Sequence, residues 1–424
     1  MKIRIPRLAT LYVALIPLVV LPTPAGKIGA VDLLLPFALI SILTYRSRQI
    51  TIPETFLAFF GFFAFLATIF NIQLGVAPPS ALMIVRVLAI FLPLVAVLGQ
   101  TKFDDDDLWA LTKVFLVSGG LALIIGIVMH HLGIQVRDDQ QRNWYGNGLG
   151  QSLRAGGLLG NTGGFGHLAS VWGVVCAGVL LLRGKFRFAA AVLALALYAT
   201  YISTSRAAFI HITVSLLFFL PIIFGGRRLI SALVALPILG LGGFYWALGV
   251  DLSPQAIFAL RRLDVLNVTG ETLFFKTARF DNWANYLGYI FEHPLLGIGF
   301  KNTENMIGTP GDNSFVTIAL ELGVICGILY AAFWIWLALR FKRAEGARSL
   351  VGMAVVFGEI AHAMTLDTHT LWISTPAALL FIAALIRTTP QNSSHVPARS
   401  QNTEWLPPSA RTPSYASRSP TAAE

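Results

Sequence analysis

Long apolar runs constrain this chain more than any other feature of its sequence. Runs of roughly 17–25 mostly hydrophobic residues recur along it, and each is long enough to cross a bilayer core of about 30 Å as a helix. Of the 424 residues, 55% are hydrophobic and only 12% are charged, whereas about a quarter of the residues of a soluble domain are charged. An outer-membrane barrel would instead show short alternating strands. The sequence therefore predicts an all-α polytopic membrane protein.

The apolar runs divide into about twelve predicted transmembrane helices. A cleaved signal peptide is the alternative for the first run, because Lys2, Arg4 and Arg7 precede it, but the helices that follow make an uncleaved first helix the simpler interpretation. The predicted helices lie near residues 8–24, 29–45, 56–71, 81–99, 108–130, 160–182, 186–203, 206–224, 228–249, 312–339, 349–366 and 370–387.

Lysine and arginine residues alternate between the predicted loops and fix an orientation. They concentrate in every second loop, and the positive-inside rule places these loops and both termini in the cytoplasm. The opposite, periplasmic face then carries a loop at residues 133–159 and a longer one at residues 250–311, between the ninth and tenth helices. Because loops of this length are uncommon unless they are functional or disordered, we expect the functional site on the outer face.

Residues 1–387 are expected to form the membrane domain. Residues 388–424 are rich in Ser, Pro and Thr, and we predict a disordered cytoplasmic tail. The net charge of +10 comes mostly from the loops and does not indicate nucleic-acid binding. Cys176 and Cys326 lie inside apolar runs, where they predict neither a disulfide nor a metal site. The acidic run Asp104–Asp107 is typical of a helix start. We expect no cofactor and no metal ion.

Arg206 opens the eighth predicted helix on its outer side. An arginine there runs against the positive-inside bias, and Ser203, Thr204 and Ser205 precede it. A guanidinium group beside hydroxyl donors suits a phosphate. The alternative is an arginine that reaches the lipid headgroups.

A second arginine, Arg279, begins an amphipathic stretch in the long outer loop. From residue 277 to residue 291, Phe280, Trp283, Tyr286 or Leu287, and Ile290 recur at helical spacing. This pattern predicts a helix lying in the outer interface with its aromatic face toward lipid. A lipid-headgroup anchor is the alternative role for Arg279.

Several carboxylates follow the long loop. Asp312 lies at the membrane mouth, either as a helix N-cap or as a general base for a sugar hydroxyl. Glu321 lies within the tenth predicted helix, where a buried carboxylate is normally paired or functional. Glu359 and His362, at helical i,i+3 spacing, are likewise expected to be paired or functional. Ion pairs among Glu321, Glu359, His362 and Arg86 are a sufficient structural explanation.

In the order of its polar motifs the chain resembles the O-antigen ligase and polymerase superfamily. No single motif is specific, but their order, spacing and shared outward topology match together over about residues 160–327. The motifs are Gly160-Asn161, Ser205-Arg206-Ala207-Ala208, Arg279 with Trp283, His293-Pro294-Leu295-Leu296-Gly297-Ile298-Gly299, Asp312-Asn313-Ser314-Phe315 and Glu321-Leu322-Gly323.

This resemblance implies an inverting glycosyltransferase of the bacterial inner membrane with GT-C-like architecture. Such enzymes act at the periplasmic face on glycans carried by undecaprenyl diphosphate, among membrane lipids, and a flippase and a chain-length regulator would be pathway partners. By resemblance, the catalytic residues are Arg206, Arg279, Asp312 and Glu321, and the substrate-binding residues are Asn161, Ser205, Trp283 and Asn313.

The resemblance leaves three functions open. Ligases transfer the glycan to lipid A core or, in relatives, to protein, whereas polymerases extend it with further repeat units. Ligases typically have His-Asn where this chain has Asp312-Asn313, which favours a polymerase of an exopolysaccharide, capsule or O-antigen. A twelve-helix transporter is the rival from another class, but transporters often show repeated halves and midplane sites, and the polar residues here gather late and outward.

Overall fold

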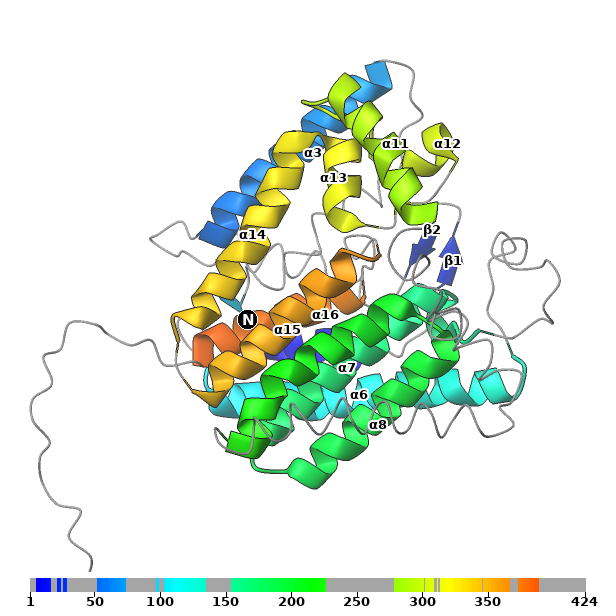
Figure 1. Ribbon diagram of the computed structural model, residues 1–424. Helices are drawn as coiled ribbons and strands as arrows, with labels where there is room; N and C mark the ends of the chain where they lie inside the picture. Colours follow the sequence, from blue (N-terminus) through cyan, green and yellow to red (C-terminus); the bar gives the residue numbers. More distant parts are fainter. Residues whose placement is uncertain are drawn as a thin grey trace, which may run out of the picture. The chain divides into compact units, whose positions relative to one another are not determined.

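The computed structural model describes a predominantly helical chain (Figure 1). Among the residues that the structure describes, five helices are long and apolar enough to cross a membrane: Asp105–His131, Thr162–Leu182, Phe186–Ser203, Arg206–Gly225 and Val324–Lys342. The residues that the structure describes are 5–16, 21–23, 26–28, 52–73, 97–98, 103–134, 154–225, 278–300, 302–308, 311, 313–344, 346–366 and 373–388.

Helix α7 is the central element of a helical bundle. Every residue from Gly164 to Leu181 is buried, as expected for a helix that is apolar on all sides. Four helices that Figure 1 labels contact it, and so does the helix Arg206–Gly225, through the pair Ser170–His211. The bundle consists of α7 (Thr162–Leu182), α6 (Asp105–His131), α8 (Phe186–Ser203), the helix Arg206–Gly225, α15 (Ala347–Ala363) and α16 (Ser374–Thr388).

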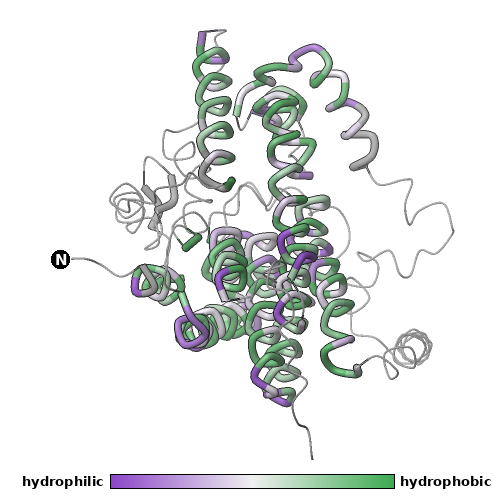
Figure 2. Tube along the Cα trace, turned by 90° about the vertical axis from the view of Figure 1, so that its left-hand side faces the viewer, coloured by the Kyte–Doolittle hydropathy of each residue, from purple (hydrophilic) through white to green (hydrophobic). Residues whose placement is uncertain are grey.

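Helix α6 has an exposed apolar stripe. Val117, Leu121, Ile124 and Val128 recur at helical spacing and are 48–70% exposed, whereas Phe115 on the other side of the helix is fully buried. An apolar stripe of this length would be costly in water and is stable against lipid. In Figure 2 hydrophobic colour likewise extends along most of the helices.

The first predicted helix, at residues 8–24, is wrong in its second half. Helix α1 covers Ile5–Ala14, and strands β1 (Leu21–Thr23) and β2 (Gly26–Ile28) follow as an antiparallel pair. Pro22 lacks a backbone N–H and does not continue a helix. At about 1.5 Å per residue, the ten residues of α1 span only half of a bilayer core. This hairpin is the exception to the all-α prediction within the described residues.

The tenth predicted helix, at residues 312–339, is two helices. Helix α13 (Ser314–Leu322) ends at Gly323, and α14 (Val324–Lys342) folds back against it. The rings of Phe315 and Tyr330 lie 5.2 Å apart, which a continuous helix does not permit. Gly323 turns the chain with a φ of 90°, in the left-handed region that favours glycine.

The segment that follows α11 (Ala278–Glu292) pairs with this turn through the backbone. A Cβ at Gly297 or at Gly323 would collide with backbone atoms of the opposite segment, so both glycines are needed for the close approach. The motif at residues 293–299 therefore holds the α13–α14 turn. The three hydrogen bonds run from Val324 N to Pro294 O (2.8 Å), from Ile298 N to Leu320 O (2.9 Å) and from Gly299 N to Glu321 O (3.1 Å).

Most other described helices follow the predicted pattern. Helix α3 (Ile52–Gln73) contains the predicted helix at 56–71, and α8 has the predicted bounds. The predicted helices at 29–45 and 228–249, nearly all of that at 81–99, and the tail lie outside the described residues. A short helix, α12 (Thr303–Ile307), precedes α13.

Candidate functional site

The start of α7 is a capped helix N-terminus. Asn161 precedes the helix, and its Oδ1 accepts hydrogen bonds from Gly163 N (2.8 Å) and Gly164 N (3.3 Å). Asparagine is among the preferred N-cap residues for this reason. The predicted substrate-binding residue Asn161 thus has its side-chain oxygen engaged by its own helix.

Arg206 begins the next helix, after a tight turn. Thr204 has a left-handed φ of 51°. Arg154 holds the turn, since its Nε donates to Thr204 Oγ1 (2.5 Å) and to Ser203 O (3.1 Å). Ser205 is buried, and Arg206 is half-buried at the first position of the helix Arg206–Gly225. The structure therefore places two arginines on one turn.

The start of α13 is capped by Asn313. Its Oδ1 accepts hydrogen bonds from Phe315 N (3.0 Å) and Val316 N (3.2 Å). Asp312 lies outside the described residues, but the N-cap role that competed with its proposed chemistry belongs to Asn313. This removes the structural explanation that the sequence offered for Asp312.

These helix starts converge at the end of α15. Ser314 Oγ donates to Leu366 O (3.0 Å), and a Cβ at Gly163 would lie 3.2 Å from the Leu366 side chain. Gly166, one turn into α7, lies against Ser205. The N-termini of α7, α13 and the helix at Arg206 are thus drawn together. Helix N-termini carry partial positive charge, which suits an anion.

Glu321 lies near the end of α13, where its side chain contacts α12. Its carboxylate is buried, with the residue 2% exposed, and Oε1 accepts a hydrogen bond from Thr303 Oγ1 (2.7 Å). Glu321 therefore connects α12 and α13.

Helix α11 forms as predicted, but part of the face that was expected to contact lipid packs against protein. Arg279 lies in its first turn, and the position of its side chain is outside the described part. Tyr286 and Ile290 are buried against Leu320 of α13, while Phe291 is 79% exposed. The prediction that the aromatic face points to lipid is wrong for Tyr286, because α13 offers that side of the helix a protein surface.

The opposite end of the bundle is basic. Arg183 Nη2 donates to Asp105 O (3.2 Å), and Arg348 forms an ion pair with the Asp105 carboxylate. Asp104 caps α6 by accepting from Asp106 N and Asp107 N, which confirms the predicted helix start. Two of the lysine- and arginine-rich loops thus meet at one end of the bundle, as their predicted placement on one face requires.

The sequence predictions missed two buried histidines. His167 is the sixth residue of α7, and His211 is the sixth residue of the helix that begins at Arg206. Glu359 pairs with His167 (3.0 Å), not with His362, whose ring nitrogens lack a hydrogen-bond partner in the described structure. The signal available in the sequence was that a histidine occupies the sixth position of both apolar helices.

Comparison with known proteins yields one family. A sequence model of the O-antigen ligase family matches residues 189–331, from α8 to the first half of α14. No curated protein matches the chain. The matched segment contains Arg206, Arg279 and the capped start of α13. Over this segment, about a third of its length, the chain is similar to the O-antigen ligase family, in agreement with the resemblance of its polar motifs.

Proposed function

We propose that this protein polymerises oligosaccharide repeat units carried on undecaprenyl diphosphate, at the periplasmic face of the bacterial inner membrane. The observation that carries the proposal is the convergence of three helix N-termini beside Arg206, in a chain whose residues 189–331 match the O-antigen ligase family. A lipid-linked diphosphate is the anion that this combination suits.

The arginines stabilise the departing diphosphate. Arg206 has a fixed place at the first position of its helix, on the turn that Arg154 holds through Thr204. Arg279 lies in the first turn of α11. Because the buried face of α11 packs on α13, the backbone at Arg279 is held in place. Planar guanidinium groups match phosphate oxygens in pairs and remain charged at every physiological pH. Charge that develops on the leaving diphosphate is thereby neutralised without a metal ion.

Asp312 is the general base of the proposed reaction. It directly precedes Asn313, whose capping role leaves Asp312 unneeded as a cap. Glu321 instead accepts a hydrogen bond from Thr303 and supports the wall of the site. Asp312 removes the proton of the acceptor hydroxyl as its oxygen bonds to the anomeric carbon, and the bond from that carbon to the phosphate oxygen breaks. The anomeric configuration inverts, and undecaprenyl diphosphate leaves.

The test uses a strain that lacks the gene and is complemented with variants. We expect Arg206→Ala, Arg279→Ala and Asp312→Asn to leave single repeat units in place of long chains, since each removes charge at the transition state. Arg206→Lys keeps the charge but loses the paired geometry, and we expect shortened chains. The measurement is polymer length by gel electrophoresis, with protein level determined in parallel.

The matched control is Arg187→Ala, an exposed arginine at the start of α8. It removes the same side chain at the basic end of the bundle and should leave polymer length unchanged. Normal chains in both Arg206→Ala and Arg279→Ala, at normal protein level, contradict the mechanism. Loss of all glycan attachment to lipid A, with polymer still made on the carrier, would instead identify a ligase.

A further inference from the structure

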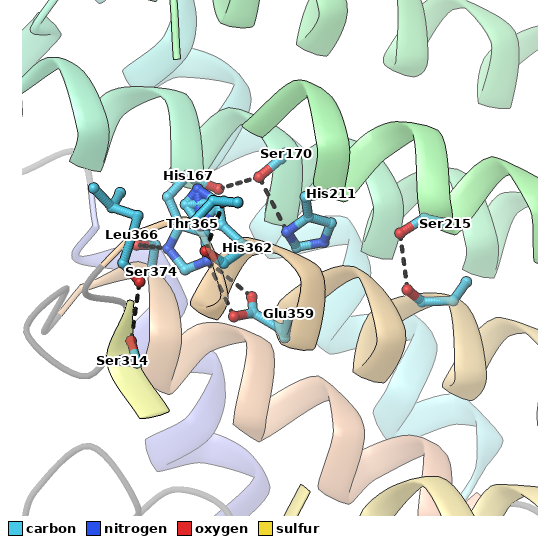
Figure 3. Close-up of polar contacts among 11 residues, drawn as sticks. His167, Ser170, His211, Ser215, Ser314, Glu359, His362, Thr365, Leu366 and Ser374 are labelled. Atoms are coloured by element: carbon cyan, nitrogen blue, oxygen red, sulfur yellow. Dashed lines mark hydrogen bonds and ion pairs between the residues drawn. The ribbon is translucent and has the colours of Figure 1, made fainter. Parts of the chain in front are cut away.

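The bundle encloses a polar cluster that the proposed transfer reaction does not use. His167, His211, Glu359 and His362 are each 0% exposed. They come from three helices, as Figure 3 shows: α7, the helix Arg206–Gly225 and α15. A fully buried carboxylate inside an apolar bundle is costly unless a positive charge or a metal ion compensates it.

The hydrogen bonds orient two imidazole rings in the same way. His167 Nδ1 lies 2.7 Å from Ser374 Oγ, and His211 Nδ1 lies 3.3 Å from Ser170 Oγ. Since Ser170 Oγ donates its own hydrogen to His167 O (2.9 Å), it accepts from His211, which puts the His211 proton on Nδ1. A hydroxyl thus holds each Nδ1 and leaves Nε2 for another partner, the arrangement found around metal-ligating histidines.

The Glu359 carboxylate lies near ligand atoms of both histidines. His167 Nε2 is 3.0 and 3.1 Å from its two oxygens, and one ligand atom from each of His167, His211 and Glu359 lies within 4.8 Å of the other two. Neighbouring ligands of a tetrahedral zinc ion, at bonds of about 2.0–2.1 Å, are about 3.4 Å apart. Small side-chain rotations therefore bring the three atoms onto one ion.

An ion pair alone does not account for the cluster. Protonated His167 beside Glu359 would satisfy those two residues, yet His211 Nε2 is buried without a hydrogen-bond partner in the described structure. A Cβ at Gly358 would lie 2.6 Å from His211 Nε2. The glycine therefore allows the His211 ring to pack closely against α15. An unsatisfied buried nitrogen costs free energy that a bound metal ion recovers.

We propose that His167, His211 and Glu359 bind one divalent transition-metal ion of the zinc class. Two imidazoles and a carboxylate are a ligand set that zinc uses, with the fourth position left to water or another donor. Metal binding releases the proton on His167 Nε2, while Ser374 and Ser170 position the two rings. His362, stacked on His167 with ring centroids 4.2 Å apart, lies outside this ligand set. The ion would tie three helices together about one and a half turns from Asn161 and Arg206.

The experiment measures metal in the full-length protein, purified in lipid nanodiscs through a tag without histidine. Cells are grown with zinc, and zinc per chain is determined by elemental mass spectrometry after desalting. We expect about one ion per chain in the wild type and at least about a tenfold loss in His211→Ala and in Glu359→Gln. The exposed-histidine control His131→Gln and the cluster control His362→Gln should keep the ion.

Two further measurements keep the test independent of folding defects. Ser170→Ala and Ser374→Ala remove only a hydroxyl, and we expect zinc affinity to fall about 10–100-fold in each. Protein grown with cobalt should show the visible absorption of a tetrahedral site, absent in Glu359→Gln. Metal-free wild-type protein, or zinc retained in both His211→Ala and Glu359→Gln, overturns the proposal. Neither readout depends on glycan transfer, so failure of one proposal leaves the other standing.

Discussion

At the scale of single residues, glycine decides where this chain can turn. Gly323 combines a φ of 90° with a Cβ position that the Leu295 carbonyl already occupies. The turn at Gly323 is the reason that α13 ends and α14 begins. The Glu-Leu-Gly and His-Pro-Leu-Leu-Gly-Ile-Gly motifs thus meet at this turn, and their glycines have a structural role that the sequence did not reveal.

A series of three glycines tests this role. Gly288 lies within α11 in open space, Gly308 has a φ of 77° in open space, and Gly323 has both the positive φ and the backbone collision. We expect Gly288→Ala to be neutral or stabilising, Gly308→Ala to cost about 1–2 kcal/mol, and Gly323→Ala to cost more. Apparent thermal unfolding midpoints in detergent measure the order. Equal midpoints for the variants at 308 and 323 would refute the backbone collision.

At the scale of elements, helix starts position the proposed chemistry. Asn161 and Asn313 cap α7 and α13, and the Ser314–Leu366 hydrogen bond joins the start of α13 to the end of α15. The capping oxygens are engaged by their own helices, so the partial positive charge of the helix starts and the arginines are the features that would attract an anion. The capping role and the proposed binding role of each asparagine can therefore be tested separately.

Substitution of Asn161 by aspartate separates its capping role from its proposed role in diphosphate binding. Aspartate caps as well as asparagine and favours the helix dipole, so we expect the unfolding midpoint to stay near that of the wild type. Its added negative charge would repel a diphosphate, and we expect polymer length to fall. Asn161→Ala should instead lose about 1 kcal/mol of stability through the missing cap. If Asn161→Asp makes polymer of normal length, the diphosphate does not bind at this helix start.

At the scale of the whole membrane domain, charge divides the bundle into two ends. Arg183 and Arg348 meet Asp105 at one end, while Arg154 and Arg206 share the turn at the other. Both native cysteines are buried. The positive-inside rule predicts that the first of these ends faces the cytoplasm.

Cysteine labelling in spheroplasts tests this orientation. Arg187 in α8 and Met306 in α12 are both exposed, and each is replaced singly by cysteine. We expect a membrane-impermeant maleimide to label Met306→Cys in intact cells and Arg187→Cys only after permeabilisation. The buried native thiols supply the unlabelled background. The reverse pattern would invert the topology and place the proposed site in the cytoplasm.

The sequence by itself determined the helical class and most helix bounds, because apolar run length and N-cap chemistry are local properties. The bounds of α8, the Asp104 cap and the existence of α11 follow from them. Only the tertiary structure decided the fold-back at Gly323, the inward face of α11 and the meeting of His167, His211 and Glu359. Each of these depends on contacts between segments distant in sequence, which hydrophobic periodicity within one segment does not encode.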